Sequence, residues 1–253
     1  MNSTIRQILL NVLKICVPIA VYILIWQVLS MRIDSSLLLP SPKETWGSIK
    51  LILGSAEGWK ILGTTLFRII RGYLFGCVAG VLLAVLTSHF LVMDWFLNPL
   101  RSLIKTTPIT SFALILLVSV QSDRLPVIVA MIVVIPMIWQ TTEEAIRGRD
   151  QRLEEMSKLF LSPWKKLRYV SIPQILPHFL ATASTALGFA WKAVITAEIL
   201  AFPKVGIGRQ MQNIKIYYDM ADLFAWTLIV IAFSVVIESI FRNVIRIVRR
   251  HYD

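Results

Sequence analysis

The chain has 253 residues, 56% of them hydrophobic, and its 26 Lys and Arg against 15 Asp and Glu give a formal net charge of +11. The mean hydropathy of +0.69 and this apolar content, against roughly 45–50% in soluble domains, exclude an ordinary soluble globule and favour a membrane protein. The basic residues flank apolar segments instead of forming one basic face with interleaved aromatic residues, which argues against a nucleic-acid-binding protein.

Six apolar segments are predicted to cross a bilayer, whose hydrocarbon core requires about 20 residues of helix. They are residues 15–29, 69–91, 100–120, 126–142, 178–202 and 223–244. The first is expected to be a retained anchor, because no small-residue cleavage site precedes Met31. Asp123 and Arg124 mark a tight polar turn between the third and fourth segments, which predicts an antiparallel hairpin; one long bent helix is the alternative.

The positions of the basic residues predict the orientation of the chain. The densest Lys and Arg clusters lie in residues 147–168 and 242–250, and short loops rich in these residues stay in the cytoplasm. Both termini are therefore predicted to be cytoplasmic. The expected organisation is an N-terminal anchor helix in residues 1–30 and a transmembrane domain in residues 31–253, which contains a cytoplasmic loop at 147–177.

Small and polar residues inside the spans have structural and functional interpretations. Gly72, Gly76 and Gly80 share one helix face, which favours close packing within the subunit over a dimer seam. Thr107, Thr110 and Ser111 beside Pro108 are candidates either to line a pathway or to bond the carbonyls that proline frees.

Lys192 lies in the fifth span, where a charge needs a cavity or a partner. Either it attracts an anionic solute, or it pairs with an acid or carbonyl on another helix; we favour the pairing. Glu198 lies about 240° further around the helix, so we expect it at the outer end of the span, against the VGIG sequence at 205–208.

The cytoplasmic segment between the fourth and fifth spans has helical periodicity. Its sequence DQRLEEMSKLFLSPWKKLRYVSIPQILP predicts two short helices broken near Ser162 and Pro163, because Ser is a common N-cap and Pro a favoured first residue. One face of the first helix carries Leu153, Met156, Leu159 and Phe160. Such a face requires a protein partner, or it rests on the bilayer surface as an interfacial hairpin.

This segment resembles the EAA loop of ABC-importer permeases. Glu154, Glu155 and Met156 fall on the EAA positions and Trp164 on the usual aromatic, while Phe160 replaces the family's glycine. Either the turn therefore moves to residues 161–163, or the docking face is bulkier than usual. The resemblance extends to LLPSP at 38–42, TLFRIIRGYLFG at 65–76, AWKAVITAEIL at 190–200, VGIG at 205–208, DLFAWT at 222–227 and the closing pattern Ile172, Pro173, Leu176 and Pro177.

The similarity to the nitrate, sulfonate and taurine permeases implies an all-α, polytopic permease of the type I ABC importer fold in the bacterial inner membrane. The implied partners are a cytoplasmic ABC ATPase dimer, a second permease copy, an extracytoplasmic substrate-binding protein and membrane lipid. The implied solute is a small anion. The residues that the resemblance assigns to ATPase coupling, within the helix at 153–164, are Glu154, Glu155, Met156, Leu159, Phe160, Leu161, Ser162 and Trp164.

No catalytic residue, metal site or cofactor is predicted. The chain has no GxxxxGK phosphate loop, so ATP energy must come from a partner. The two cysteines, Cys16 and Cys77, both lie in apolar runs and do not form a CxxC motif. The alternatives are an integral membrane enzyme, which should show acids or histidines at catalytic spacing, and a membrane scaffold without transport activity.

Overall fold

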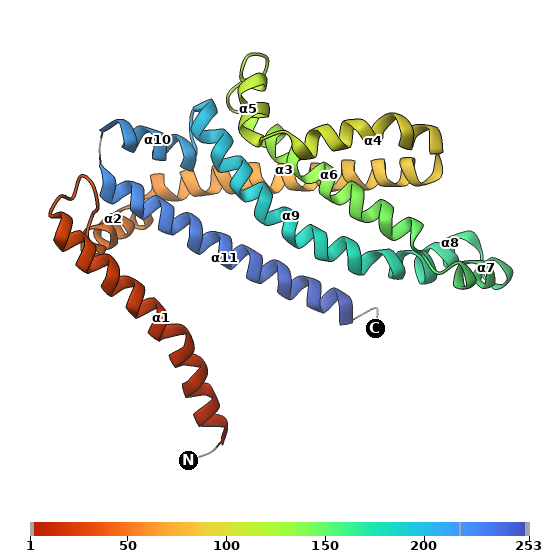
Figure 1. The fold of residues 1–253 in the computed structure, drawn as a ribbon, viewed down its shortest axis with the longest axis horizontal. Coiled ribbons are helices and arrows are strands. Elements are labelled where there is room, and N and C mark those ends of the chain that lie inside the picture. Colours follow the sequence, from red (N-terminus) through yellow and green to blue (C-terminus); the bar gives the residue numbers. More distant parts are fainter. Residues whose placement is uncertain (1–2, 218, 251–253) are drawn as a thin grey trace. The chain divides into compact units, whose positions relative to one another are not determined.

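The computed structural model describes residues 3–217 and 219–250, and all the regular elements among them are helical (Figure 1). The helices are α1 (Ser3–Ile33), α2 (Pro42–Gly54), α3 (Ala56–His89), α4 (Leu91–Thr106), α5 (Ile109–Leu117), α6 (Leu125–Arg147), α7 (Gln151–Phe160), α8 (Pro163–Lys166), the π-helical turn η1 (Leu167–Ser171), α9 (Ile172–Ala201), α10 (Ile207–Tyr217) and α11 (Met220–Arg250). The predicted all-α class is confirmed.

The chain divides into two compact units, one of which comprises Met1–Trp59 and Met211–Val230. In this unit the Trp26 indole donates a hydrogen bond to the Pro40 carbonyl at 2.9 Å and stacks on Phe224 at a centroid distance of 5.8 Å. Ser41 caps α2 in a reciprocal capping box with Glu44. The loop after α1 is therefore fixed by side-chain hydrogen bonds and aromatic stacking.

The other unit comprises Lys60–Gln210 and Ile231–Asp253 and is built around α6. Alanines of α9 allow α6 and α5 to approach closely in a core that also contains apolar side chains from both of those helices. The buried members of this core are Ala113, Leu125, Val129, Ala193, Ala197 and Ala201. The free thiol of Cys77 is buried in α3, whereas the side chain of Cys16 lies outside the described residues.

Helices α3 and α6 cross so closely that three glycines of α3 have no room for a side chain. A Cβ built on Gly72 would lie 2.6 Å from the Ala130 Cβ, and one on Gly80 would lie 2.8 Å from the Ile138 Cβ. Gly76 makes the same approach between them. The glycine spacing therefore serves packing within one subunit, as predicted.

Within residues 3–217 and 219–250, four helices are long and apolar enough to cross a membrane, or five if the bent α4–α5 pair counts as one span. The four lie in Ala56–His89, Leu125–Arg147, Pro163–Ala201 and Met220–Ile247, and Val17–Ile33 is a shorter apolar helix. The six predicted segments all fall on these helices.

The third segment, predicted as one helix over residues 100–120, is wrong in detail. Helix α4 begins at Leu91 and ends at Thr106, and α5 follows after a bend of 100°. Thr107 and Pro108, which separate the two helices, have extended backbones with ψ of 131° and 137°. Thr107 leaves the helical geometry because it precedes a proline. Helix α5, with nine residues, is about 14 Å long and cannot span the bilayer alone.

Candidate functional site

Helices α7 and α8 form a hairpin that projects from the adjoining ends of α6 and α9 (Figure 1). The Asp150 carboxylate caps α7 by accepting hydrogen bonds from the backbone N–H groups of Arg152 and Leu153, at 2.9 and 3.4 Å. The helix ends at Phe160, and α8 starts at Pro163 with Ser162 at its N-cap position, where it makes no side-chain cap hydrogen bond. The predicted break at residues 162–163 is confirmed.

The turn of this hairpin requires no glycine. Leu161 and Ser162 have extended backbone, with φ of −120° and −64°. Among the described non-glycine residues, only Asp34 and Phe202 have positive φ. A bulky Phe160 is therefore compatible with the turn, which lies at residues 161–162, within the first of the two predicted alternatives.

Glu154 braces the hairpin from within. Its carboxylate accepts hydrogen bonds from Arg149 at 2.9 Å and from the Ser171 hydroxyl at 2.8 Å, and it pairs with Lys166 at 2.5 Å. Burial raises the pKa of this carboxyl, but these partners outweigh burial, and its pKa lies below the ordinary value. With its side chain 15% exposed, Glu154 joins α7 to α8 and to η1 instead of facing outward.

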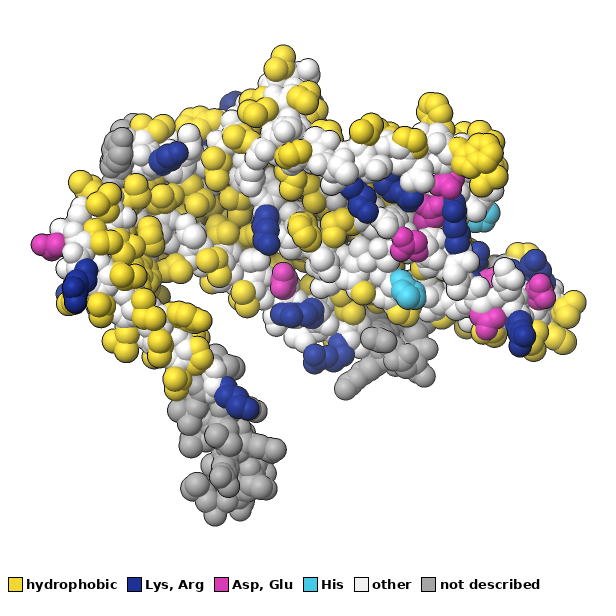
Figure 2. Space-filling view, viewed as in Figure 1, with side chains coloured by type: hydrophobic (Ala, Val, Ile, Leu, Met, Phe, Trp, Pro, Cys, Tyr) yellow, Lys and Arg dark blue, Asp and Glu magenta, His cyan; other side chains and the backbone are white. Residues whose placement is uncertain are grey.

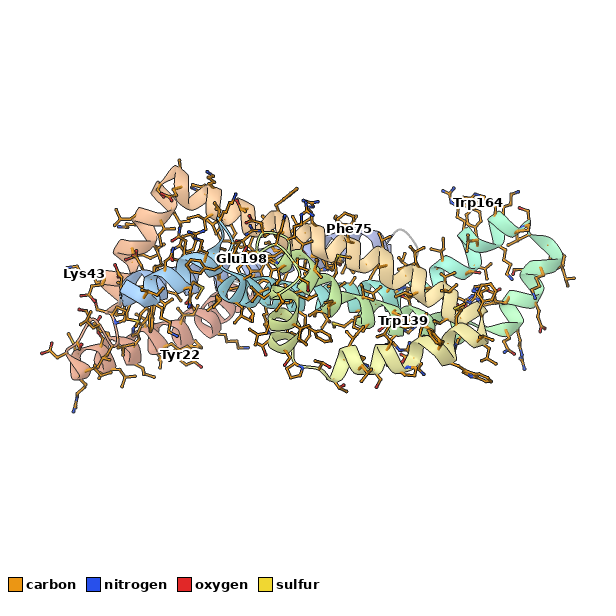
Figure 3. The ribbon with its side chains drawn as sticks, turned by 90° about the horizontal axis from the view of Figure 1, so that it is seen from above. Tyr22, Lys43, Phe75, Trp139, Trp164 and Glu198 are labelled. Atoms are coloured by element: carbon orange, nitrogen blue, oxygen red, sulfur yellow. The ribbon has the colours of Figure 1, made fainter. Side chains whose placement is uncertain are left out.

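The outer face of the hairpin is apolar and open to solvent. Leu159 and Phe160 are each 80% exposed, and Trp164 is 72% exposed. Leu153 and Met156 are also exposed on α7. Hydrophobic side chains gather at this tip beside Lys, Arg, Asp and Glu (Figure 2), and Trp164 points away from α8 (Figure 3). Large apolar side chains gathered on an exposed tip mark a contact surface.

The other residues that the resemblance assigns to ATPase coupling differ in their exposure to solvent. Glu155 and Ser162 are exposed at the tip, while Leu161 is half-buried in the turn. Together with the apolar face they give the hairpin one solvent-facing surface, with Glu154 behind it.

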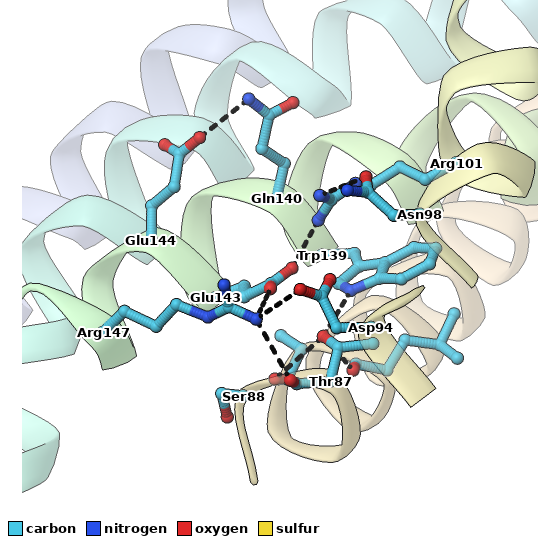
Figure 4. A network of polar contacts seen from close by, with 12 residues as sticks. Thr87, Ser88, Asp94, Asn98, Arg101, Trp139, Gln140, Glu143, Glu144 and Arg147 are labelled. Atoms are coloured by element: carbon cyan, nitrogen blue, oxygen red, sulfur yellow. Dashed lines mark hydrogen bonds and ion pairs between the residues drawn. The ribbon is translucent and has the colours of Figure 1, made fainter. Parts of the chain in front are cut away.

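A partly buried charged network fixes the end of α6 from which α7 follows (Figure 4). Glu143 pairs with Arg101 of α4 and with Arg147 one turn later on α6, at 2.6 Å for the second pair. Arg147 also reaches Asp94 of α4 at 2.9 Å. The Thr87 hydroxyl of α3 accepts a hydrogen bond from the Trp139 indole at 2.9 Å. Three helices are thus joined at the base of the hairpin.

This network was not predicted from the sequence, because its members are far apart in the chain. The available clue was the position of Asp94 and Glu143 beside or within apolar helices, where an acid needs partners. The pair of Glu143 and Arg147 is the one contact that the sequence itself indicates, because residues four apart on a helix are neighbours.

A buried set of polar contacts around Glu198 lies where α9 meets the start of α10. Glu198, whose side chain is fully buried, accepts hydrogen bonds from Arg68 at 2.7 Å, from Thr65 at 3.0 Å and from the Gly208 N–H at 3.0 Å. A Cβ on Gly206 would lie 2.7 Å from this carboxylate. The predicted contact of Glu198 with the sequence at 205–208 is confirmed, whereas its partner Arg68 was not predicted.

The structure does not bring the four candidate pathway residues into one cluster. The Thr107 hydroxyl donates to the Leu103 carbonyl at 2.7 Å, and that carbonyl also accepts the Thr107 N–H, so this bond does not satisfy the Ile104 carbonyl that Pro108 frees. Thr107 also lines a cavity. Thr110 is exposed and Ser111 half-buried on α5. Lys192 is exposed, with its ammonium 5.7 Å from the centroid of the Phe189 ring. Within residues 3–217 and 219–250 no acid forms an ion pair with Lys192.

The described residues hold no group of three or more His, Cys, Asp or Glu side chains that could bind a metal ion. The hairpin combines an exposed apolar tip with paired charges behind it.

The sequence and the fold of the chain are similar to those of known proteins. Residues 72–250 match the model of a family described as the binding-protein-dependent transport system inner membrane component. The chain is 24% identical, over 214 residues, to the Bacillus subtilis (strain 168) protein assigned as aliphatic sulfonates transport permease SsuC; the match covers 83% of this chain and 77% of that one. It is 27% identical, over 201 residues, to the bicarbonate transport system permease protein CmpB of Synechocystis sp., covering 74% and 71%.

A solved chain of the MetNI methionine ABC transporter, in an inward-facing conformation, has a similar fold. The TM-score is 0.59 at 17% sequence identity, and the match covers 75% of this chain and 93% of that one. The fold is therefore that of a type I ABC importer permease.

Proposed function

Because the chain belongs to the binding-protein-dependent transport system inner membrane component family, we propose that it is the permease that couples solute import to a cytoplasmic ABC ATPase through the α7–α8 hairpin. The chain is accordingly a transport subunit and not an enzyme. The alternatives of an integral membrane enzyme and a scaffold are set aside on the family assignment.

The observation that carries the coupling proposal is the exposed apolar face of α7 on a braced hairpin. Burying one Leu or Phe side chain contributes about 1.5–3 kcal/mol, and Leu159 and Phe160 are both 80% exposed. Glu154 holds α7 against α8 and η1, so force on the tip would pass into α9. The network at Glu143 would carry the same force into α3 and α4.

The partners and the orientation follow from this role. The proposal places residues 147–177 and both termini in the cytoplasm and treats residues 1–30 as an anchor that precedes the permease domain, residues 31–253. The complex would contain an ATPase dimer, a second permease copy and an extracytoplasmic binding protein. The relatives named for aliphatic sulfonates and bicarbonate suggest that the solute is a small anion.

Copurification tests the coupling proposal. The full chain is coexpressed with its ATPase as wild type and as Met156→Asp plus Leu159→Asp, and both proteins are quantified in the membrane complex. We expect the double variant to lose the ATPase while reaching the membrane at normal levels. Lys158→Asp is the matched control, because it adds a negative charge to the same helix at an exposed site without removing apolar surface. Retention of the ATPase by the double variant would contradict the proposal.

Labelling with a membrane-impermeant thiol reagent tests the orientation. Cysteines introduced at Ser55 and Gln212 should react from outside intact cells, and one at Lys166 only in inside-out vesicles. The opposite labelling would place the hairpin on the wrong side for an ATPase.

A further inference from the structure

The carboxylate of Glu238, in the second half of α11, rests against the backbone of α9. A Cβ built on Gly188 would lie 2.9 Å from the Glu238 Oε1. Nearby, the Tyr73 hydroxyl of α3 donates a hydrogen bond to the Ala183 carbonyl at 3.1 Å, and its ring meets Phe241 edge-on at a centroid distance of 5.9 Å. Helix α3 therefore contacts both α9 and α11 at this level, and a glycine gives the carboxylate room between them.

Lys192 lies on the same face of α9 as Gly188. It is four residues further along the helix, which turns it by only about 40° and raises it by about 6 Å. Phe189 and Lys192 are exposed on this face. Ala190 and Trp191, on the other side of α9, are buried. The lysine is thus one turn above the point where the Glu238 carboxylate meets α9.

The side chains of Lys192 and Glu238 lean toward each other. Helices α9 and α11 run in opposite directions (Figure 1), and the second half of α11 belongs to the same compact unit as α9. Every Cα–Cβ bond of a helix tilts toward its own N-terminus. Lys192 therefore leans down toward Gly188, and Glu238 leans up toward the level of Lys192. The flexible four-carbon stem of lysine spans one helical turn, so a rotation of this stem brings the ammonium to the carboxylate.

Both charges lie in helices that are long and apolar enough to cross a membrane. A charge in such a place is costly and normally pairs with another. Among the ion pairs of the described residues, however, none includes Glu238 or Lys192. The Lys192 ammonium instead lies 5.7 Å from the centroid of the Phe189 ring, within the range of a cation–π contact. Lys192 thus has two alternative partners within reach, the Phe189 ring and the Glu238 carboxylate.

We propose that Lys192 and Glu238 form an intramembrane latch between α9 and α11. The latch closes as an ion pair in one state of the transport cycle and opens in the other, when Lys192 contacts Phe189; the structure shows the open position. The proposal rests on the permease function above. Because α9 continues directly from the hairpin through η1, a closed latch would pass movement of the hairpin on to α11.

Charge exchange tests the pairing. Lys192→Glu and Glu238→Lys each place two like charges side by side, and we expect each to lower the amount of full chain in the membrane about tenfold, as for coupled residues in contact. The combined variant should restore this amount to within twofold of wild type. The matched control combines Glu238→Lys with Arg242→Glu, because Arg242 is an exposed cation four residues along α11 and the competing partner. Normal levels of both single variants, no restoration by the first exchange, or equal restoration by the control would overturn the latch.

Reagent selectivity tests the opening. Lys192→Cys is placed in the full chain with Cys16→Ala and Cys77→Ala, and vesicles with the complete complex are treated with cationic methanethiosulfonate ethylammonium or anionic methanethiosulfonate ethylsulfonate. The ratio of the cationic to the anionic rate reports a nearby carboxylate. We expect this ratio to differ at least threefold between nucleotide-free vesicles and vesicles trapped with ATP and vanadate. Equal ratios in the two conditions would overturn the latch.

In the state with the higher ratio, Glu238→Gln should lower it roughly fivefold, as for the loss of one charge about 4 Å away. Glu57→Gln, which changes an exposed acid of α3, is the matched control and should leave the ratio unchanged. If Glu238→Gln does not reach the membrane, Gly188→Ala replaces it, because the added methyl group displaces the carboxylate. A ratio that ignores these changes would contradict the pairing.

ATPase copurification is read from the same vesicles. Charge exchange requires no ATPase, so its failure with the ATPase still bound would refute the latch and leave the coupling proposal intact. Loss of the ATPase from a chain that passes the charge-exchange test would refute the coupling proposal instead.

Discussion

The close crossing of α3 and α6 makes Gly76 sensitive to the smallest possible enlargement. A Cβ at Gly76 would lie 2.7 Å from the Val134 Cβ and 2.8 Å from its Cγ1, so Gly76→Ala forces the two helices apart. Overpacking of this kind costs about 1–3 kcal/mol, against about 0.5–1 kcal/mol gained from the better helix propensity of Ala. Gly63, also in α3, has no atom within 4 Å of its Cβ position, so Gly63→Ala should show the gain alone.

We therefore expect Gly76→Ala to be less stable than Gly63→Ala by the overpacking cost, which lowers the Tm by roughly 2–12 °C for a chain of this size. The assay is thermal unfolding of the purified full chain in one detergent, followed by the reactivity of the buried Cys77 thiol. Gly76→Leu should lower the Tm further. A Gly76→Ala protein that melts at or above Gly63→Ala would refute the close-crossing argument.

Three other predictions concern the hairpin and the buried contacts of Glu198. Glu154→Gln should speed hydrogen exchange across α7, α8 and η1. In the wild type, because the folded pKa is below the ordinary 4.5, the brace should be present above that pH and be lost as pH falls through the folded value; slow exchange in the variant would contradict this. Glu198→Gln should destabilise the purified chain by about 1–3 kcal/mol, because Arg68 loses the charge of its buried partner but keeps its ion pair with Asp123; an unchanged Tm would contradict this. Phe160→Gly should weaken ATPase binding about tenfold, measured by titration; equal or tighter binding would place Phe160 against its own chain.

Local chemistry made parts of the structure predictable. Ser162 and Pro163 are a helix-starting pair, and the structure breaks the hairpin there. The four-residue spacing of Gly72 to Gly80 predicted a close helix approach within the subunit. Helical periodicity placed Glu198 on the side away from Lys192, and the carboxylate does meet Gly208.

Other features required the tertiary structure. Hydropathy averaged over residues 100–120 suggests one span, and a proline inside a membrane helix does not by itself predict a bend of 100°. At the same place α4 contacts α6 through the ion pair of Arg101 with Glu143 and the hydrogen bond from Lys105 to Gln140. The brace of Glu154 likewise joins it to Lys166 and Ser171 across a turn. No helical repeat pairs residues at such distances in sequence.

The most direct test of the central claim is site-specific crosslinking from the tip of the hairpin. A photoreactive benzoylphenylalanine replaces Leu159 in the full chain, and illuminated membranes are analysed for covalent adducts with the coexpressed ATPase. The matched site is Leu51 of α2, an equally apolar and exposed position that the proposed topology places outside the cytoplasm. The account predicts an ATPase adduct from position 159 and none from position 51. Adducts from position 159 with lipid alone would show that the hairpin rests on the bilayer and would contradict coupling through α7.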